Sequence, residues 1–178
     1  MITFRNIIGM FDVIANKHYE INSFHSGMMD EVDINKLGAE DYTILYIEPS
    51  NATINQGSLT YNFNIYVMDM ISEDVASMDV YNGSNDEKQR VGRVDAYSEL
   101  LQVLQDVINE FKQSVYATSW VKNPHDKTLP SDIVLQVPIN ADPFTARFNN
   151  LLTGWTATLS IEVNNTNSLC DVPIDPND

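Results

Sequence analysis

Two stretches in which apolar and polar residues strictly alternate predict the best-defined strands of the chain. From Leu59 to Met68, the odd-numbered positions are apolar or aromatic, whereas most even-numbered positions are polar. From Trp155 to Val163 the same alternation returns. Because successive side chains of a strand point to opposite faces of a sheet, each stretch predicts one face against the core and one polar face.

Two further stretches have the spacing of three and four residues that is typical of an amphipathic helix. The first runs from about Thr3 to Asn16, with Thr3 as a candidate N-cap. The second runs from about Val94 to Gln113 and is expected to pack on a sheet. The apolar stripe of the first helix is Phe4, Ile7, Ile8, Phe11, Ile14 and Ala15, and that of the second is Val94, Tyr97, Leu100, Leu101, Leu104, Val107, Ile108 and Phe111.

Four shorter segments predict additional strands. From Tyr42 to Ile47, odd- and even-numbered positions alike are rich in β-branched and aromatic residues. This predicts a central strand that is covered on both faces and ends at Glu48 and Pro49. Weaker strand patterns cover Tyr19 to Phe24, Ile133 to Pro138, and Phe144 to Phe148.

Turn-forming and polar residues predict the connections. These are an acidic loop from Met28 to Asp41, a hairpin-type connection from Pro49 to Ser58, a long acidic segment from Asp69 to Val91, a loop through Trp120, Pro124 and Pro130, and a turn at Asn149, Asn150 and Gly154. The order of elements predicts one α+β domain over residues 1–178, with an antiparallel or mixed sheet and helices packed on one face. Residues 69–93 form a long acidic loop or arm in this plan, and residues 164–178 an extended C-terminal tail.

The charge balance changes the functional picture. The chain has 178 residues with 25 acids and 10 bases, which gives a formal net charge of −15. Such a chain repels phosphates on average, so tight binding to nucleic acid is not expected. Seven acids and one base lie between Glu20 and Glu48, and six acids and no base between Asp69 and Glu87. These runs are compatible with solvated loops and with a surface that DNA passes without adhering.

The localisation signals are few. The first ten residues contain Arg5 and Asn6 within their apolar stretch and precede no small-residue cleavage site, so the sequence predicts synthesis and residence in the cytosol. No apolar run approaches the length of a membrane span. Cys170 is the single cysteine, which excludes a disulfide within the chain.

No catalytic motif emerges from the sequence, and no cofactor is expected. His18, His25 and His125 lack metal-ligand spacing, and the glycines form no phosphate-binding loop. The best carboxylate group for a hard cation is Asp69, Glu73, Asp74 and Asp79, although its spacing fits no calcium loop. An acidic, cation-dependent hydrolase built on this group remains an alternative hypothesis.

The polar sides of the two best strands are candidate contact surfaces. They are either ordinary solvent surface or surfaces that lie against another subunit, because protein interfaces need not be more apolar than the rest of a surface. The candidate interface residues are Thr60, Asn62 and Asn64 on the first strand, and Thr156, Thr158 and Ser160 on the second.

In the order and spacing of its elements, the chain resembles the tail terminator and neck-type structural proteins of tailed bacteriophages. The segments that carry this resemblance follow the short N-terminal amphipathic helix and span nearly the whole chain. They are DYTILYIEPS from Asp41 to Ser50, LTYNFNIYVMD from Leu59 to Asp69, LLQVLQDVI from Leu100 to Ile108, TGWTATLSIEV from Thr153 to Val163, and CDVPI from Cys170 to Ile174.

The resemblance implies a non-enzymatic virion protein that is made in the bacterial host cytoplasm and assembles as a ring, with a hexamer as the expected order. Such a ring would end the tail, contact tail-tube and head-connector proteins, and let DNA pass without specific binding or any contact with a membrane. Another head-completion, connector or tail-tube protein of the same particle is the alternative. The acids expected at the lumen or rim are Asp30, Glu31, Asp33, Glu73, Asp74, Asp79, Asp86 and Glu87.

Overall fold

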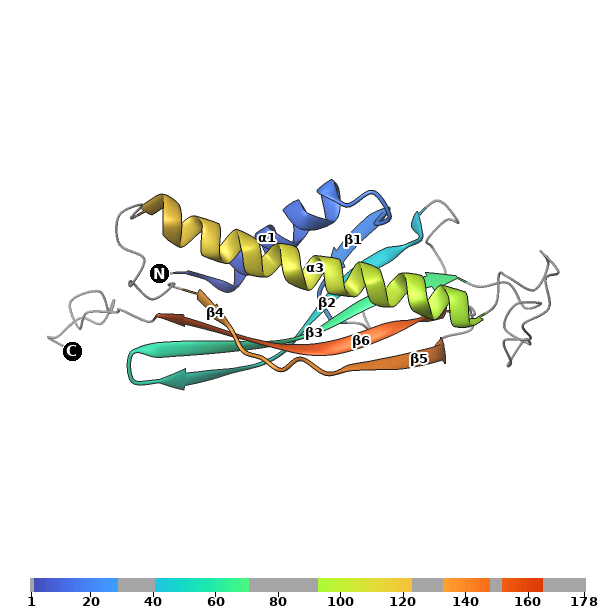
Figure 1. Cartoon of the computed structure of the whole chain (residues 1–178). Helices are drawn as coiled ribbons and strands as arrows, with labels where there is room; N and C mark the ends of the chain where they lie inside the picture. The colour runs from blue at the N-terminus through green and yellow to red at the C-terminus, as the bar shows by residue number, and fades with distance from the viewer. Residues whose placement is uncertain (1, 29–40, 71–92, 123–132, 148–151, 165–178) are drawn as a thin grey trace, which may run out of the picture.

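The computed structural model describes residues 2–28, 41–70, 93–122, 133–147 and 152–164, and it has the predicted α+β architecture. A curled, mixed sheet of six strands carries both helices on one face (Figure 1). The elements are α1 (Phe4–Lys17), β1 (Ser23–Ser26), β2 (Ile44–Asn55), β3 (Ser58–Met70), α3 (Arg93–Lys122), β4 (Ile133–Leu135), β5 (Ala141–Arg147) and β6 (Leu152–Asn164).

The order of the sheet is β1-β2-β3-β6-β4, and β5 also pairs with β6. β1 runs parallel to β2, whereas every other pair is antiparallel. The two strands with the clearest alternation, β3 and β6, pair over their full lengths, from Ser58 opposite Asn164 to Met70 opposite Leu152. With β2 on one side and β4 and β5 on the other, they form the middle of the sheet.

Helix α1 confirms the predicted cap and most of the predicted apolar stripe, whereas Phe4 of that stripe is 38% exposed. The Thr3 hydroxyl accepts a hydrogen bond from the Asn6 N–H, and the Asn6 side chain accepts one from the Thr3 N–H at 2.9 Å. This reciprocal capping box satisfies N–H groups that have no partner within the helix. The buried side of the helix is Ile7, Phe11, Ile14 and Ala15.

Helix α3 is longer than predicted. It continues to Lys122, so Trp120 belongs to the helix and not to a loop. The sequence between Gln113 and Lys122 contains neither glycine nor proline, the two residues that most strongly interrupt a helix. Its buried residues among those described are Leu100, Val103, Leu104, Val107, Phe111 and Val115, whereas Leu101 of the predicted stripe is 38% exposed.

The main core lies between the helices and one face of the sheet. Phe11 of α1 and Phe111 of α3 are completely buried and stack with ring centroids 4.4 Å apart and planes only 3° from parallel. Beneath the helices, Phe63, Ile65 and Val67 of β3 contribute fully buried side chains to the same cluster. The predicted packing of the long helix on a sheet is thereby confirmed.

Strand β2 corrects the predicted connection from Pro49 to Ser58. Residues Ile44 to Ile47 are buried, as predicted for a central strand, but the strand does not end at Glu48 and Pro49 and continues to Asn55. A register shift between Pro49 and Asn51 accommodates the proline within the ladder. The turn itself is short, and Gly57 adopts φ +87°, a conformation that favours glycine.

Gly154 is also corrected, because it lies inside β6 and not in a turn. It is opposite Met68 of β3 and opposite Phe144 of β5. A Cβ at this position would overlap the Val67 carbonyl oxygen and approach the Met68 Cα within 2.9 Å. The glycine therefore permits the close approach of two backbones. From the sequence alone, a glycine required for such a contact looks the same as a glycine in a turn.

The weaker strand predictions were right about the presence of strands and less accurate about their limits. β1 begins at Ser23 and not at Tyr19, and β5 begins at Ala141 and not at Phe144. β4 is limited to Ile133–Leu135 and stops before Pro138. The predicted acidic loop (apart from Met28 and Asp41), most of the segment after Asp69, and the C-terminal tail beyond Asn164 lie outside the described residues.

A second, smaller core corrects the prediction that the other face of β3 is polar throughout. Tyr66 and Met68 alternate with Ile65 and Val67, so they lie on the face opposite the helices, yet both are buried. The polar face of β3 is thus confined to its first half. The second cluster comprises Tyr42, Ile44, Tyr46, Tyr66, Met68, Phe144 and Leu152.

Candidate functional site

All six predicted interface residues lie together on the sheet face opposite the helices. Strand register brings them side by side, with Asn62 opposite Ser160 and Asn64 opposite Thr158. Thr60 and Thr156 continue the same alternation at either end. With Glu48 and Asn51 of the neighbouring strand β2, these six residues form a surface that we call the polar face.

The first row of the polar face crosses three strands through hydrogen bonds between side chains. The Ser160 hydroxyl of β6 donates to Asn62 Oδ1 of β3 at 2.6 Å. The Asn62 Nδ2 group donates in turn to Asn51 Oδ1 of β2, also at 2.6 Å. The Asn62 side chain thus accepts a hydrogen bond at Oδ1 and donates one from Nδ2, which fixes the orientation of its amide group.

The second row has the same arrangement and ends at a carboxylate. The Thr158 hydroxyl donates to Asn64 Oδ1 at 3.2 Å, and Asn64 Nδ2 donates to Glu48 Oε2 at 3.3 Å. The Tyr66 hydroxyl donates to the same Glu48 oxygen at 3.0 Å. Glu48 therefore joins the polar face to the second core, and its charge receives two hydrogen bonds from neighbouring side chains.

Beside these rows, the edge of the polar face is hollowed. A depression of about 310 Å³ is lined by residues that include Asn140, Asp142, Thr156 and Thr158. Apart from Asp142, this lining is uncharged. The polar face is thus an ordered array of amides and hydroxyls, a composition suited to hydrogen bonding with another protein surface.

Sequence reasoning did not assign Glu48 and Asn51 to this surface, because the strand was predicted to end at Glu48 and Pro49 and the chain after it to be a connection. A usable signal was present in the sequence. Polar Asn51, Thr53 and Asn55 alternate with Ala52 and Ile54, which is the pattern of a strand that resumes after the proline.

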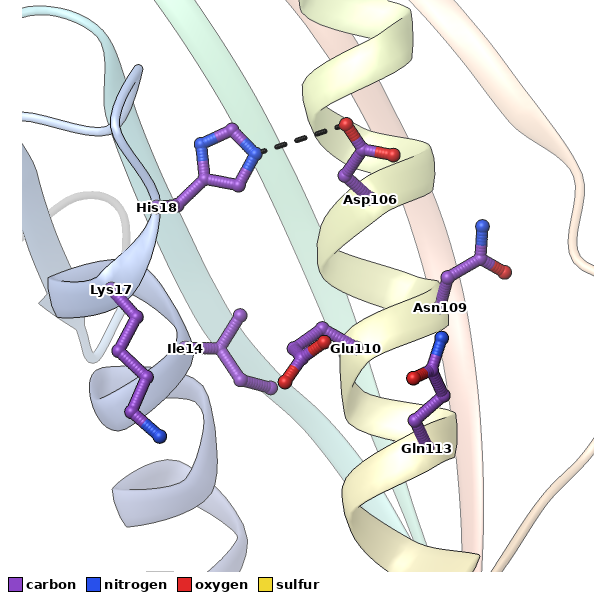
Figure 2. A pocket seen from close by; sticks show the side chains of 7 residues that line it. All are labelled: Ile14, Lys17, His18, Asp106, Asn109, Glu110 and Gln113. Carbon is purple, nitrogen blue, oxygen red and sulfur yellow. Dashed lines mark ion pairs between the residues drawn. The ribbon is translucent and has the colours of Figure 1, made fainter.

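A separate cleft of about 500 Å³ lies between the end of α1 and the middle of α3 (Figure 2). Lys17 and His18 of the α1 side face Asp106 and Glu110 of α3 across it. In the part of the chain that the structure describes, no group of three or more His, Cys, Asp and Glu side chains is placed to hold a metal ion.

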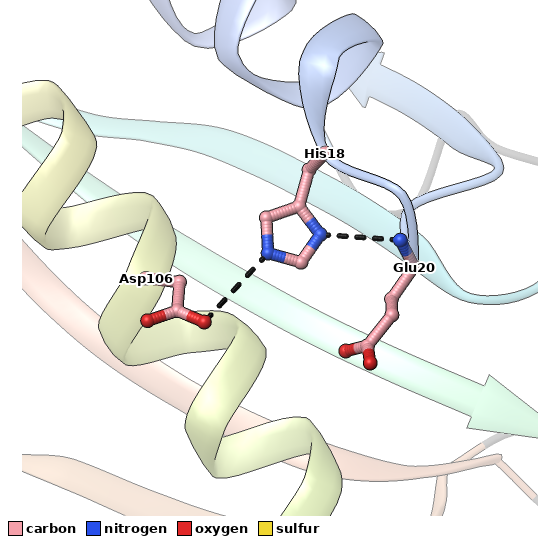
Figure 3. A network of polar contacts seen from close by, with 3 residues as sticks. All are labelled: His18, Glu20 and Asp106. Atoms are coloured by element: carbon pink, nitrogen blue, oxygen red, sulfur yellow. Dashed lines mark hydrogen bonds and ion pairs between the residues drawn. The ribbon is translucent and has the colours of Figure 1, made fainter.

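His18 is the polar link between the two sides of this cleft (Figure 3). Its Nε2 atom lies 3.9 Å from Asp106 Oδ2, and its Nδ1 atom accepts a hydrogen bond from the Glu20 N–H at 3.3 Å. Accepting at Nδ1 places the ring hydrogen of the neutral tautomer at Nε2, toward the carboxylate. This arrangement links the end of α1 to α3.

The eight acids predicted for the lumen or rim all fall outside the described residues, so their placement stays a prediction. Of the predicted cation-binding carboxylates, the structure describes Asp69 alone. Its Oδ2 atom accepts a hydrogen bond from the Thr43 hydroxyl at 3.2 Å, and its Oδ1 atom accepts one from the Met70 N–H at 2.6 Å. Asp69 is thereby held against the backbone and the neighbouring strand.

The contact between Asn51 and Asn62 can be measured by a double-mutant cycle. Removing the Asn62 amide with Asn62→Ala is expected to lower the free energy of unfolding by about 1 kcal/mol, because two hydrogen bonds are lost at a half-buried position. The coupling energy with Asn51→Ala is expected to be about 0.5 kcal/mol or more. Urea unfolding of the four chains gives both values.

Asn55 provides the matched control, because it is an exposed asparagine of the same strand near the hairpin turn, opposite Ser58. The effects of Asn55→Ala and Asn62→Ala are expected to add. A cycle in which Asn51 and Asn62 are also additive would contradict the assigned hydrogen bond.

The sequence matches no protein-family model and no curated protein. Among the described residues, no helix is both long and apolar enough to span a bilayer. The fold and the polar face are therefore the basis on which a function can be proposed.

Proposed function

We propose that the chain is a non-enzymatic structural protein of a tailed bacteriophage, which forms a ring at the joint between tail and neck. The ring ends the tail, connects it to the head and leaves a lumen through which DNA passes. The expected order is six. The chain acts in this proposal by contact with copies of itself and with tail-tube and head-connector proteins, and it resides in the virion.

The observation that carries the proposal is the polar face. The helices lie on one side of the sheet. On the other side, beside the second core, two hydrogen-bonded rows cross β6, β3 and β2: Ser160, Asn62 and Asn51 form one, and Thr158, Asn64 and Glu48 form the other. Because many of their polar groups already bond to one another, the side chains are held in place before a partner arrives, which lowers the entropic cost of association. The resemblance to tail terminator and neck-type proteins supports the same conclusion.

The charge of the chain agrees with a role around passing DNA. Six copies at −15 each would carry a formal charge of −90. Where acids line a channel, they repel phosphates and hinder adhesion of the duplex. The eight predicted lumen or rim acids are the part of the chain to which this role is assigned.

The assembly state tests the proposal directly. The purified chain is studied by light scattering over a concentration series, first alone and then with the tail-tube protein of the same phage. The expected product is a ring of six copies of the 20.1 kDa chain, about 121 kDa, visible by negative-stain electron microscopy.

A chain that remains monomeric at every concentration and forms no ring with the tube protein would contradict the proposal. Mapping the chain to the capsid joint or along the tail tube would instead favour the alternative, a head-completion, connector or tube protein. Calorimetry with Mg²⁺ and Ca²⁺ addresses the hydrolase alternative, for which binding in the micromolar range is required.

A further inference from the structure

The hollow at the margin of the polar face is lined mostly by polar side chains. It has a volume of about 310 Å³ and lies between β6 and the segment that leads from β4 into β5. Thr156 and Thr158 of β6 line it together with Pro138, Asn140 and Asp142. Because pockets for drug-sized ligands have volumes of about 300 to 1,000 Å³, this hollow is at the small end of that range and suits a single side chain.

Asp142 is the charged group of the hollow. It is exposed and lies directly opposite Thr156 in the ladder between β5 and β6. Its carboxylate forms no hydrogen bond or ion pair with any other described residue. The Glu48 carboxylate differs, because its Oε2 atom accepts hydrogen bonds from Asn64 and Tyr66. Both carboxylate oxygens of Asp142 are therefore available to a ligand.

The neighbouring side chains of the hollow can accept hydrogen bonds as well. Neither the Asn140 amide nor the Thr156 hydroxyl has a hydrogen-bond partner within the described part of the chain. The Thr158 hydroxyl donates its hydrogen to Asn64 Oδ1, which leaves its own oxygen free to accept. A group that donates several hydrogen bonds at once can therefore bind to Asp142 and to these side chains together.

The charges on the polar side of the sheet favour a basic ligand. Strand register places three carboxylates on this side, with Glu48 opposite Asn64, Asp142 opposite Thr156, and Glu162 opposite Thr60. The basic side chains that the structure describes belong to the two helices on the other side of the sheet (Figure 1), and they are Arg5, Lys17 and Lys112. A positively charged surface would thus meet complementary charges on the polar side.

A second copy of this chain is a poorer occupant than a different protein. Two polar faces in contact would place carboxylates against carboxylates. The helical side of a second copy is no better, because its described acids outnumber its three bases: Asp12, Asp95, Glu99, Asp106 and Glu110. A basic surface of another protein therefore complements the polar face best.

An arginine side chain fits the hollow better than a lysine. Its guanidinium group is planar and has five N–H donors, so it can bind both oxygens of one carboxylate and still donate to neighbouring oxygens. A lysine ammonium group offers three donors from a single atom. Pro138 in the lining and Val137 beside it, which is 64% exposed, provide apolar surface for the methylene groups of the arginine.

We propose that the hollow at Asp142 binds the guanidinium group of an arginine from a different, basic protein that packs on the polar face. Asp142 pairs with the charge, and Asn140, Thr156 and Thr158 accept further hydrogen bonds. Only the identity of that protein, a tail-tube or head-connector protein, rests on the proposed function. The recognition of arginine is a property of this chain alone.

Short capped peptides test the site on the purified chain. The peptide acetyl-Gly-Arg-Gly-amide is titrated into isotopically labelled protein and followed by two-dimensional NMR. The backbone amide signals of Asn140, Asp142, Thr156 and Thr158 are expected to shift together and to saturate in the millimolar range, because a single exposed ion pair is weak. The matching lysine peptide is expected to bind about threefold more weakly. The citrulline peptide, which has the shape of arginine without its charge, is expected to bind about tenfold more weakly.

Asp142→Asn is expected to weaken binding of the arginine peptide about fivefold, because it removes the charge and keeps the size of the side chain. Glu99→Gln is the matched control, since Glu99 is an exposed carboxylate of α3 and its loss changes the net charge by the same amount. The control should leave the affinity unchanged. An equal loss of affinity in both variants would attribute the binding to the overall charge of the chain and would contradict the proposal.

The proposal is overturned if the four signals do not move at about 20 mM arginine peptide, or if the lysine or citrulline peptide binds as well as the arginine peptide. Shifts of the same signals on dilution of the protein alone would also overturn it, because they would show that a second copy occupies the hollow. Light scattering tests the ring separately. A ring without arginine binding refutes the site and leaves the proposed function standing. Arginine binding by a chain that forms no ring, alone or with the tube protein, does the reverse.

Discussion

Gly154→Ala is expected to lower the free energy of unfolding by about 3 kcal/mol, although it adds a single methyl group. The added Cβ would collide with the Val67 carbonyl oxygen and lie 2.9 Å from the Met68 Cα. Both atoms belong to the backbone of β3, which pairs with β6 over thirteen residues and cannot move aside at one position alone. The clash therefore strains the longest strand pair of the sheet, and Met68 and Phe144 of the second core lie directly opposite the glycine.

Gly9→Ala is the matched control and is expected to have the opposite sign. Gly9 is an exposed residue of α1, and an added Cβ there meets nothing within 4 Å. Because alanine has a higher helix propensity than glycine, this variant should gain about 0.5–1 kcal/mol. Urea unfolding followed by circular dichroism measures both. Equal stability of Gly154→Ala and the parent chain would show that β3 and β6 do not approach as closely as described.

Phe11→Ala is expected to have the largest effect of the substitutions considered, a loss of about 4 kcal/mol. Its ring is completely buried and stacks in parallel on Phe111 at 4.4 Å, so truncation both removes transfer free energy and leaves a cavity between the two helices. The expected consequence is that α1 separates from α3 more readily than the sheet unfolds. Hydrogen exchange should then increase in α1 before it increases in β3 and β6.

Val13→Ala on the same helix serves as the control, because Val13 is 50% exposed and should change stability by less than about 0.5 kcal/mol. A cycle with Phe111→Ala measures the coupling between the two rings, which is expected to be about 1 kcal/mol. If Phe11→Ala and Val13→Ala have similar effects, α1 does not pack on α3 as described.

The elements that could be predicted from the sequence are those in which a local pattern and the tertiary environment agree. The stripe of α1 and the alternation of β3 and β6 each specify a buried face directly. The same alternation identified the six polar residues of the polar face, four of which form rows across β3 and β6. Their assembly into one surface required the register Asn62 opposite Ser160, which depends on a contact 98 residues apart in the sequence.

Two of the incorrect predictions have a common physical origin, because each used a local pattern where a distant partner decided the outcome. Pro49 would end an isolated strand, but β3 supplies the partner that carries β2 past it to Asn55 through a register shift. The polar side of β3 was predicted to be polar throughout, yet Tyr66 and Met68 are buried with residues of β2, β5 and β6.

The sequence by itself therefore determined the fold class, the core side of α1 and of the longest strands, and the acidic character of the chain, since these follow from the order of polar and apolar side chains along one segment. Only the tertiary structure decided the order in which the strands pair, why Gly154 must be a glycine, and how Glu48 and Asn51 join the polar face. These features depend on the distance between backbones that are far apart in the chain, and a pattern within one segment contains no measure of that distance.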